Sequence, residues 1–172
     1  MYSYLSSSIK KQFYDNKPHV IHHHHHHYDR PAPTGDFKIV IVLDESGSMQ
    51  TIRHQMIKAI NDLIMEQKQV VGRPATFTLV KFNQNTNRVV TDMPLKDVDY
   101  LTEMSYSPSG STALYDAIGE TITRLKHDRD VLMVIVTDGQ ENASRHYRKY
   151  EIESMIESKK SAYGWTYVYL SN

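Results

Sequence analysis

The sequence predicts an α/β fold in which a doubly wound, mostly parallel sheet has helices on both faces and one antiparallel edge strand. Two segments, "FKIVIVL" (37–43) and "DVLMVIVTD" (130–138), are almost continuously apolar, as parallel strands covered on both faces are. Segments with apolar residues at helical spacing lie between the predicted strands. This alternation of strands and helices is typical of a Rossmann-like sheet.

Length and composition limit the classes of protein to consider. A chain of 172 residues holds one domain with room for a tail. Lysine and arginine balance aspartate and glutamate, 20 against 20, so there is no electrostatic reason to expect a nucleic acid or an anionic membrane as partner. Cysteine is absent, which excludes disulfides and thiolate metal sites. Because no signal-like or membrane-spanning apolar run is present, we expect a cytoplasmic protein.

Residues 1–36 differ in composition from the rest, and we predict that they form an N-terminal tail. A six-histidine run and a Pro-rich linker precede Phe37, and the run is either an affinity tag or a natural histidine tract. Farther upstream, four apolar residues fall at helical spacing and indicate a short amphipathic helix: Tyr2, Leu5, Ile9 and Phe13. The folded domain is predicted over residues 37–172.

The elements after the first strand follow from periodicity and turn residues. Apolar residues from Ile52 to Val71 recur at helical spacing, and Gly72 is predicted to end that helix. The segments "ATFTLVKF" and "NRVVTDM" flank the polar "NQNT", which predicts a hairpin and therefore the antiparallel edge strand. Residues 94–109 are rich in turn formers and predict an irregular segment.

The second half of the chain repeats the pattern of helix and strand. A helical stripe begins at Leu114 and ends at Leu125, and a third stripe around Ile152 ends at Gly164. The segment "WTYVYL" (165–170) alternates as the last strand. These elements complete the predicted sheet and place its helices between the strands.

Carboxylates and hydroxyls gather where two parallel strands end. Asp44 follows "IVIVL", Asp138 follows "LMVIVT", and "SPSGSTALYDAI" brings Thr112 to the start of a helix. Ligands of open α/β sheets bind beyond the carboxyl ends of the strands. Helix capping accounts for any one of Ser46, Ser48 and Thr112, but not for two carboxylates and three hydroxyls at one edge. Hard oxygen ligands of this kind indicate a divalent cation, Mg²⁺ or Mn²⁺.

At these residues the sequence resembles the von Willebrand factor A domain family. "DESGS" (44–48), "SGSTALYDAI" and "VIVTDGQEN" match the family's three metal loops and occur in the same order. The resemblance implies a metal-ion-dependent adhesion site and a strand order of 3-2-1-4-5. The implied metal ligands are the hydroxyls of Ser46, Ser48 and Thr112, together with Asp44 and Asp138 directly or through water. It also implies that an acidic residue of a protein partner completes the coordination of the ion.

Two other functions stay open. A phosphotransferase of the haloacid-dehalogenase type would use Asp44 as its nucleophile, but it needs a second carboxylate two residues later, where this chain has Ser46. A scaffold without metal would use the loop residues only to cap helices. We expect the protein not to be an enzyme.

The last predicted strand has an edge that needs a neighbour. The family resemblance implies a further strand and helix after "WTYVYL", and the sequence contains neither. An apolar edge with no proline and no charge is a template for pairing with another strand. The candidates are residues beyond Asn172, the N-terminal segment, and a second copy of the chain, which would make the protein self-associate.

Overall fold

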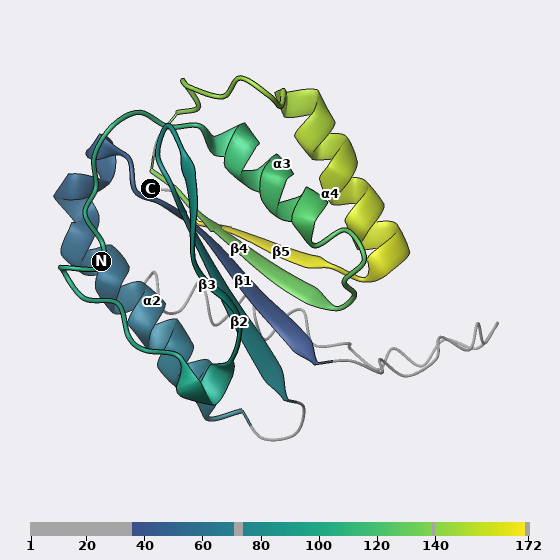
Figure 1. Cartoon of the computed structure of the whole chain (residues 1–172), viewed down its shortest axis with the longest axis horizontal. Helices are drawn as coiled ribbons and strands as arrows, with labels where there is room; N and C mark the ends of the chain where they lie inside the picture. Colours follow the sequence, from purple (N-terminus) through teal and green to yellow (C-terminus); the bar gives the residue numbers. More distant parts are fainter. Residues whose placement is uncertain (1–35, 71–73, 139, 171–172) are drawn as a thin grey trace. The chain divides into compact units, whose positions relative to one another are not determined.

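The sheet observed in the computed structural model has five strands in the order β3-β2-β1-β4-β5 (Figure 1). The structure describes residues 36–70, 74–138 and 140–170. The strands are β1 (Phe37–Asp44), β2 (Ala75–Phe82), β3 (Thr86–Pro94), β4 (Val131–Val136) and β5 (Thr166–Leu170). The predicted strand order and α/β class are confirmed. The predicted N-terminal tail and its helix lie outside the described residues.

Strand register decides which loops meet. β1 pairs in parallel with β2 and with β4, and β4 pairs in parallel with β5. Among the described strands, β2 and β3 form the one antiparallel pair. Asp44 at the end of β1 lies opposite Phe82, and Leu43 lies opposite Val136. The loops that follow β1, β2 and β4 therefore leave the sheet at the same edge.

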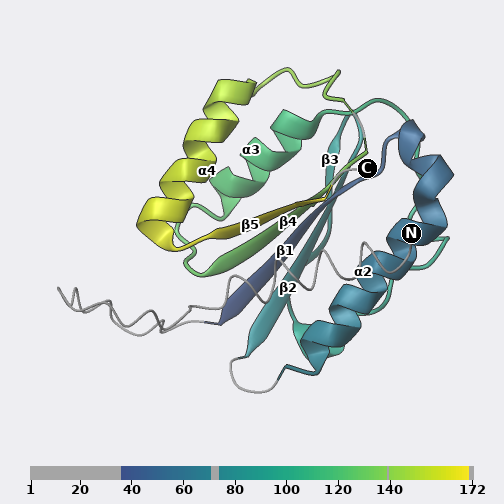
Figure 2. The same cartoon turned by 180° about the vertical axis from the view of Figure 1, so that it is seen from behind.

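Within the described residues, three α-helices and two short 3₁₀-helices pack around this sheet. The α-helices are α2 (Arg53–Lys68), α3 (Leu114–Arg124) and α4 (Lys149–Tyr163), and the 3₁₀-helices are η1 (Gly47–Ile52) and η2 (Leu95–Asp97). Figures 1 and 2 show α2 on one face of the sheet and α3 with α4 on the other. No helix in the described part of the chain has the length and apolar character needed to cross a membrane.

The apolar residues of β1 alternate between two layers of core. Val40 and Val42 pack with Ile118 of α3, Ile152 of α4 and Trp165. Because successive side chains of a strand point to opposite faces, Ile39, Ile41 and Leu43 face the α2 side, and all are buried. Burial on both faces is the reason this strand is apolar at every position from Ile39 to Leu43.

The ends of two helices test the capping predictions. Gly164 takes the left-handed conformation at the end of α4, with φ of 70°, as predicted. The helix α2 was predicted to continue to Val71 and end at Gly72, which lie outside the described residues, but it ends at Lys68. The amides of Gln69 and Val70 donate to Glu66 and Gln67 three residues back, so the chain tightens into a turn before the apolar stripe is complete.

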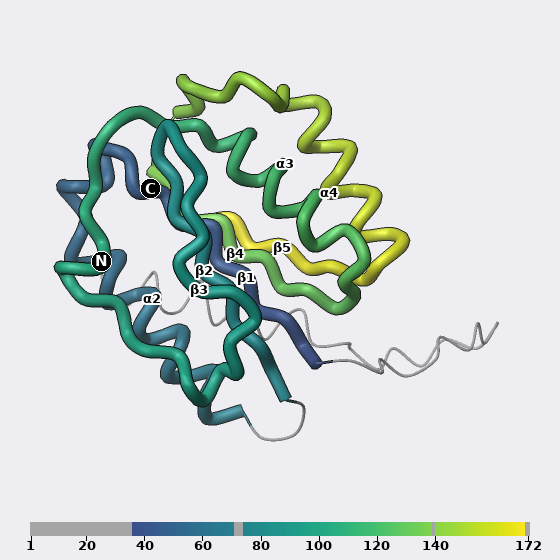
Figure 3. Tube along the Cα trace, in the orientation of Figure 1, coloured from purple at the N-terminus to yellow at the C-terminus, as the bar shows by residue number. Residues whose placement is uncertain are grey.

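The segment between η2 and α3 is irregular, as predicted, and runs along α2 (Figure 3). The side chain of Asn61 exchanges two hydrogen bonds with the backbone of Leu101, at 2.9 and 2.7 Å. Arg53 donates from Nε to the carbonyl of Tyr106 at 2.9 Å. These contacts from α2 fix the segment and bring Tyr106 to the end of β1.

Candidate metal centre

Asp44 is fully buried at the end of β1 and shapes the loop that follows it. Its Oδ1 accepts a hydrogen bond from the amide of Ser46 at 2.7 Å, and its Oδ2 accepts one from the hydroxyl of Thr137 at 2.6 Å. The carboxylate thus joins the loop after β1 to the end of β4. Since a carboxylate has about four acceptor positions, these two bonds leave acceptor capacity on both oxygens for a cation or a bridging water.

Ser46, Ser48 and Asp138 form a chain of polar contacts. The hydroxyl oxygens of Ser46 and Ser48 lie 3.2 Å apart, and the Ser48 hydroxyl donates to Oδ1 of Asp138 at 2.8 Å. Neighbouring oxygens around an octahedral Mg²⁺, with bonds of about 2.1 Å, lie about 3 Å apart. The donor spacing therefore fits adjacent ligands of one small hard cation.

The hydroxyls of this edge do not cap helices. Ser46 precedes η1 but makes no side-chain capping bond, and the residue that precedes α3 is Ala113, not Thr112. Thr112 is 3% exposed, and its hydroxyl makes no hydrogen bond to another described residue. The explanation by capping is therefore wrong for Ser46 and Thr112, and their oxygens stay available to a ligand.

Thr112 is held at the edge through its backbone. Its amide donates to the side chain of Asn142 at 2.8 Å, while the amide of Asn142 donates back to the Thr112 carbonyl at 3.0 Å. The amide of Gly47 donates to the carbonyl of Gly110 at 2.9 Å. These bonds join the loops that carry all five predicted site residues. The role of these residues as metal ligands stays a prediction.

Tyr106 belongs to this edge, although nothing in its sequence context indicated it. Its side chain is fully buried, and its hydroxyl donates to the carbonyl of Asp44 at 2.6 Å. Burial, followed by the charges of Asp44 and Glu45, raises the pKa of Tyr106 well above its usual range. The phenol therefore stays protonated and supports β1 at the point where the site begins.

Glu45, the residue between Asp44 and Ser46, makes contacts that stabilise the fold. Its Oε1 accepts hydrogen bonds from Nζ of Lys81 and from the amide of Ser107, both at 2.8 Å. The ion pair with Lys81 is largely buried. Glu45 therefore fixes the irregular segment against β2, and its carboxylate is already neutralised.

Two acids that the sequence analysis did not assign hold the loop after β4 to α3. Asp116 accepts hydrogen bonds from the amides of Arg145, His146 and Tyr147 at 2.7, 2.9 and 2.9 Å. Glu141 lies on the loop itself, and its carboxylate accepts a hydrogen bond from the amide of Tyr115 on α3 at 3.0 Å. We call Asp116 and Glu141 the acid latch, because together they fix the loop that begins with Asp138.

The latch makes the loop sensitive to acid. Burial alone would raise the pKa of Asp116, but the three backbone hydrogen bonds outweigh it and lower the pKa below the ordinary 3.8. For Glu141, burial is likewise outweighed by hydrogen bonds from Ser144, Tyr115 and Ala143, which lower the pKa below the ordinary 4.5. Both carboxylates thus bind protons less readily in the folded chain than in the unfolded chain.

We expect the free energy of unfolding to fall as the pH drops below about 4. A carboxylate whose pKa is lower in the folded chain than in the unfolded chain stabilises the fold at pH values above its pKa in the unfolded chain. This contribution is lost as the pH falls and the folded chain takes up the proton. Urea unfolding at a series of pH values measures the effect. Asp116→Asn should make the free energy of unfolding depend less steeply on pH in this range. Asp99→Asn, a control at an exposed position, should not change this dependence. An acid slope that is the same in Asp116→Asn and the parent would contradict the latch.

Carboxylates alone do not make a metal centre here. No group of three or more His, Asp or Glu side chains gathers at metal-binding distance within residues 36–70, 74–138 and 140–170. A centre at this edge therefore needs the serine and threonine hydroxyls beside its two aspartates. Hydroxyls and carboxylates are both hard oxygen donors, the kind that Mg²⁺ and Mn²⁺ prefer.

The fold and this edge define an open α/β domain with polar loops beyond the carboxyl ends of its parallel strands. The family model for the von Willebrand factor type A domain matches residues 38–169. The chain therefore belongs to the von Willebrand factor type A domain family. A comparison with curated proteins gives no match.

Solved structures agree on the fold. Proximal thread matrix protein 1 from the mussel byssus, in a form titled "with zinc occupied MIDAS motif", is 19% identical with a TM-score of 0.56 over 80% of this chain and 36% of its own. The ArnB paralog VWA2 from Sulfolobus acidocaldarius is 12% identical, with a TM-score of 0.55 over 78% and 34%. A von Willebrand factor type A protein from Catenulispora acidiphila is 17% identical, with a TM-score of 0.54 over 79% and 33%. The chain spans about a third of the length of these proteins.

Proposed function

We propose that this protein is a divalent-metal-dependent protein-binding module. The observation that carries the proposal is the contact chain Ser46–Ser48–Asp138, whose spacings of 3.2 and 2.8 Å suit adjacent ligands of one cation. Ser46, Ser48 and Thr112 would bind Mg²⁺ or Mn²⁺ through their hydroxyls, and Asp44 and Asp138 directly or through water. The zinc-occupied motif of the mussel protein supports a divalent metal in a protein of similar fold.

The proposed partner is a protein that presents an aspartate or glutamate. An octahedral ion that is bound by these five side chains keeps one coordination position for an oxygen from outside, which a carboxylate can supply. Within the described residues, the nearest further acid in sequence is Glu45, which already pairs with Lys81. The carboxylate that completes the ion would therefore come from another molecule. A cytoplasmic location and the absence of nucleic-acid and membrane partners remain part of this proposal.

We further propose that the bound ion recognises a ligand without catalysing a reaction. The phosphotransferase alternative lacks the carboxylate that it would need at position 46, where the Ser46 hydroxyl lies against Ser48. Hydrolysis of a generic phosphomonoester should stay at background in the parent chain. A turnover that is lost in Asp44→Asn would favour the phosphotransferase instead.

Self-association through β5 also remains part of the proposal. Among the described strands β5 pairs only with β4, and Tyr169 on it is half exposed. Trp165, in contrast, is buried in the core beside α3 and α4, so it does not contribute to an exposed edge.

A direct test compares partner capture in Mg²⁺ with capture in EDTA. Immobilised chain should retain a partner only in Mg²⁺, and changing one acidic residue of that partner to Gln or Asn should weaken the complex. Ser48→Ala provides a matched variant because Ser48 is exposed, so the change removes one proposed ligand and its contacts with Ser46 and Asp138 without opening a cavity in the core. A partner that binds equally well in EDTA and to Ser48→Ala would show that the interface lies elsewhere.

A further inference from the structure

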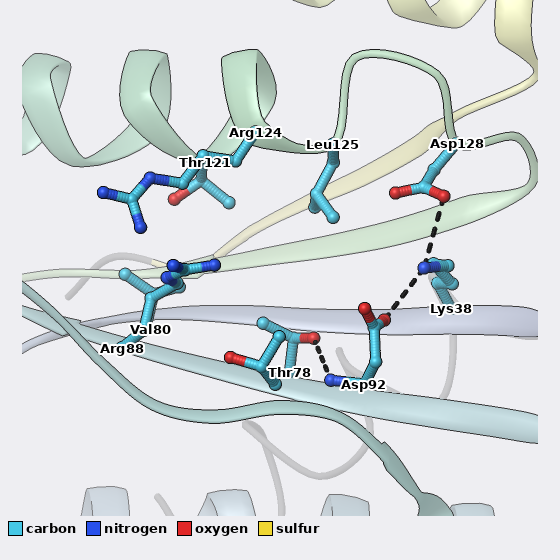
Figure 4. Close-up of a pocket in the computed structure, with 10 residues that line it drawn as sticks. Lys38, Thr78, Val80, Arg88, Asp92, Thr121, Arg124, Leu125 and Asp128 are labelled. Carbon is cyan, nitrogen blue, oxygen red and sulfur yellow. Dashed lines mark hydrogen bonds and ion pairs between the residues drawn. The ribbon is translucent and has the colours of Figure 1, made fainter.

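A polar pocket lies between α3 and the strands β1, β2 and β3 (Figure 4). Its volume is about 220 Å³. Lys38 lines it near the start of β1, whereas Asp44 ends that strand. The arginine end of the pocket lies closer to that edge, because Arg88 pairs with Val80, and Val80 pairs with Val42 two residues before Asp44. The lining of the pocket nevertheless includes none of the five candidate metal ligands.

The two acids of this pocket share one lysine. Lys38 donates to Oδ1 of Asp92 at 2.8 Å and lies 3.2 Å from Oδ1 of Asp128. Burial opposes the charge of Lys38, but the hydrogen bonds and charges of the two aspartates outweigh it and raise its pKa. Lys38 therefore stays protonated and shared between the carboxylates at that end of the pocket.

The other end of the pocket holds two cations without a counter-ion. Arg88 of β3 and Arg124 of α3 extend toward this end, opposite the Lys38 cluster (Figure 4). Neither guanidinium makes an ion pair or hydrogen bond to another described residue. Both aspartates of the pocket bond Lys38 and neither bonds an arginine, and three cations against two acids leave the lining with a net charge of +1.

We propose that this pocket binds a small phosphate-bearing anion between Arg88 and Arg124. A phosphate carries a charge of about −1.5 to −2 near pH 7, which two guanidinium groups balance better than they balance a single carboxylate. Guanidinium forks also match the oxygens of phosphate with paired hydrogen bonds. The volume of about 220 Å³ is sufficient for free phosphate or a short phosphomonoester.

Calorimetric titration in EDTA tests this proposal, because removing divalent ions prevents phosphate from binding through the metal edge. The probes are inorganic phosphate, glycerol 3-phosphate and acetate. Saturable phosphate binding is expected, with at least a tenfold loss in Arg88→Gln and in Arg124→Gln. Arg145→Gln, an exposed arginine outside the pocket, should bind as the parent does, and melting temperatures confirm that each variant folds.

The three probes distinguish the source of the anion. Binding of glycerol 3-phosphate that is tighter than that of phosphate would assign the pocket to an ester, and tighter binding of phosphate would assign it to the free ion. Either result supports the proposal. It is overturned if no probe binds saturably, if acetate binds as tightly as phosphate, or if the pocket variants bind as well as Arg145→Gln.

Discussion

Replacing Asp44 with Ala is expected to weaken Mg²⁺ binding by at least about 100-fold, because groups that orient metal ligands typically contribute 10- to 100-fold each. The change removes a negative charge from the site and the acceptor that positions Ser46 at 2.7 Å. It also removes the acceptor of the Thr137 hydroxyl. Calorimetry with Mg²⁺ measures the loss.

Asp62→Ala is the matched control for this experiment. Asp62 is also an aspartate, but it lies on α2 and pairs with Lys58 at the surface. Its replacement should leave Mg²⁺ affinity unchanged. If Asp44→Ala folds and binds Mg²⁺ as tightly as Asp62→Ala does, the ion is held somewhere other than the edge after β1.

Replacing Asp116 with Ala is expected to lower the free energy of unfolding by about 3 kcal/mol, since hydrogen bonds to a charged group contribute about 1.5–3 kcal/mol and the freed amides lose their partner. Three amides of the loop 145–147 depend on this carboxylate. Urea unfolding near pH 7 measures the loss. Mg²⁺ affinity should fall as well, because the same loop begins at Asp138.

Asp116→Asn separates the charge from the shape of the latch. It keeps one carbonyl acceptor, so it should retain part of the stability that Asp116→Ala loses. An unfolding free energy that is unchanged in both variants would mean that the loop is held by its other contacts, such as those of Glu141.

The sequence predicted those parts of the fold and site that depend on local pattern. A buried parallel strand is apolar throughout, and its end is marked by the change to polar residues, so Asp44 and Asp138 could be placed at one edge. The hydrogen bonds between Asp44, Ser46, Ser48 and Asp138 agree with that placement. The division into a tail and a domain at residue 37 stays a prediction.

The supporting contacts could not be predicted, because they join residues far apart in the chain. Tyr106 reaches Asp44 from an irregular segment 62 residues later, and such a segment has no periodicity to show where it folds. In the sequence, Asp116 is indistinguishable from an acid on a helix surface, and only the fold brings the amide of Arg145 to its carboxylate. Arg88 and Arg124 resemble ordinary exposed arginines, and only the fold brings them to one pocket.

The early end of α2 has a similar cause. The apolar residues keep helical spacing as far as Val71. Such spacing indicates only which face of a helix is apolar, and it does not predict the turn that Gln69 and Val70 form. Helix ends are set by such backbone hydrogen bonds, which the side-chain pattern does not encode.

The most direct test of the proposed metal site is the position of a bound paramagnetic ion. Mn²⁺ should be titrated into the full chain with residues 22–27 changed to serine, because a histidine run binds transition metals by itself. Selective broadening of the amide signals of Ser46, Ser48, Thr112 and Asp138 is expected, reversed by excess Mg²⁺. The signals of Asp92 and Asp128, which contact Lys38 at the opposite end of β1, should stay sharp. Broadening that avoids the loops of the proposed site, or that persists unchanged in Asp44→Ala, would contradict the proposal.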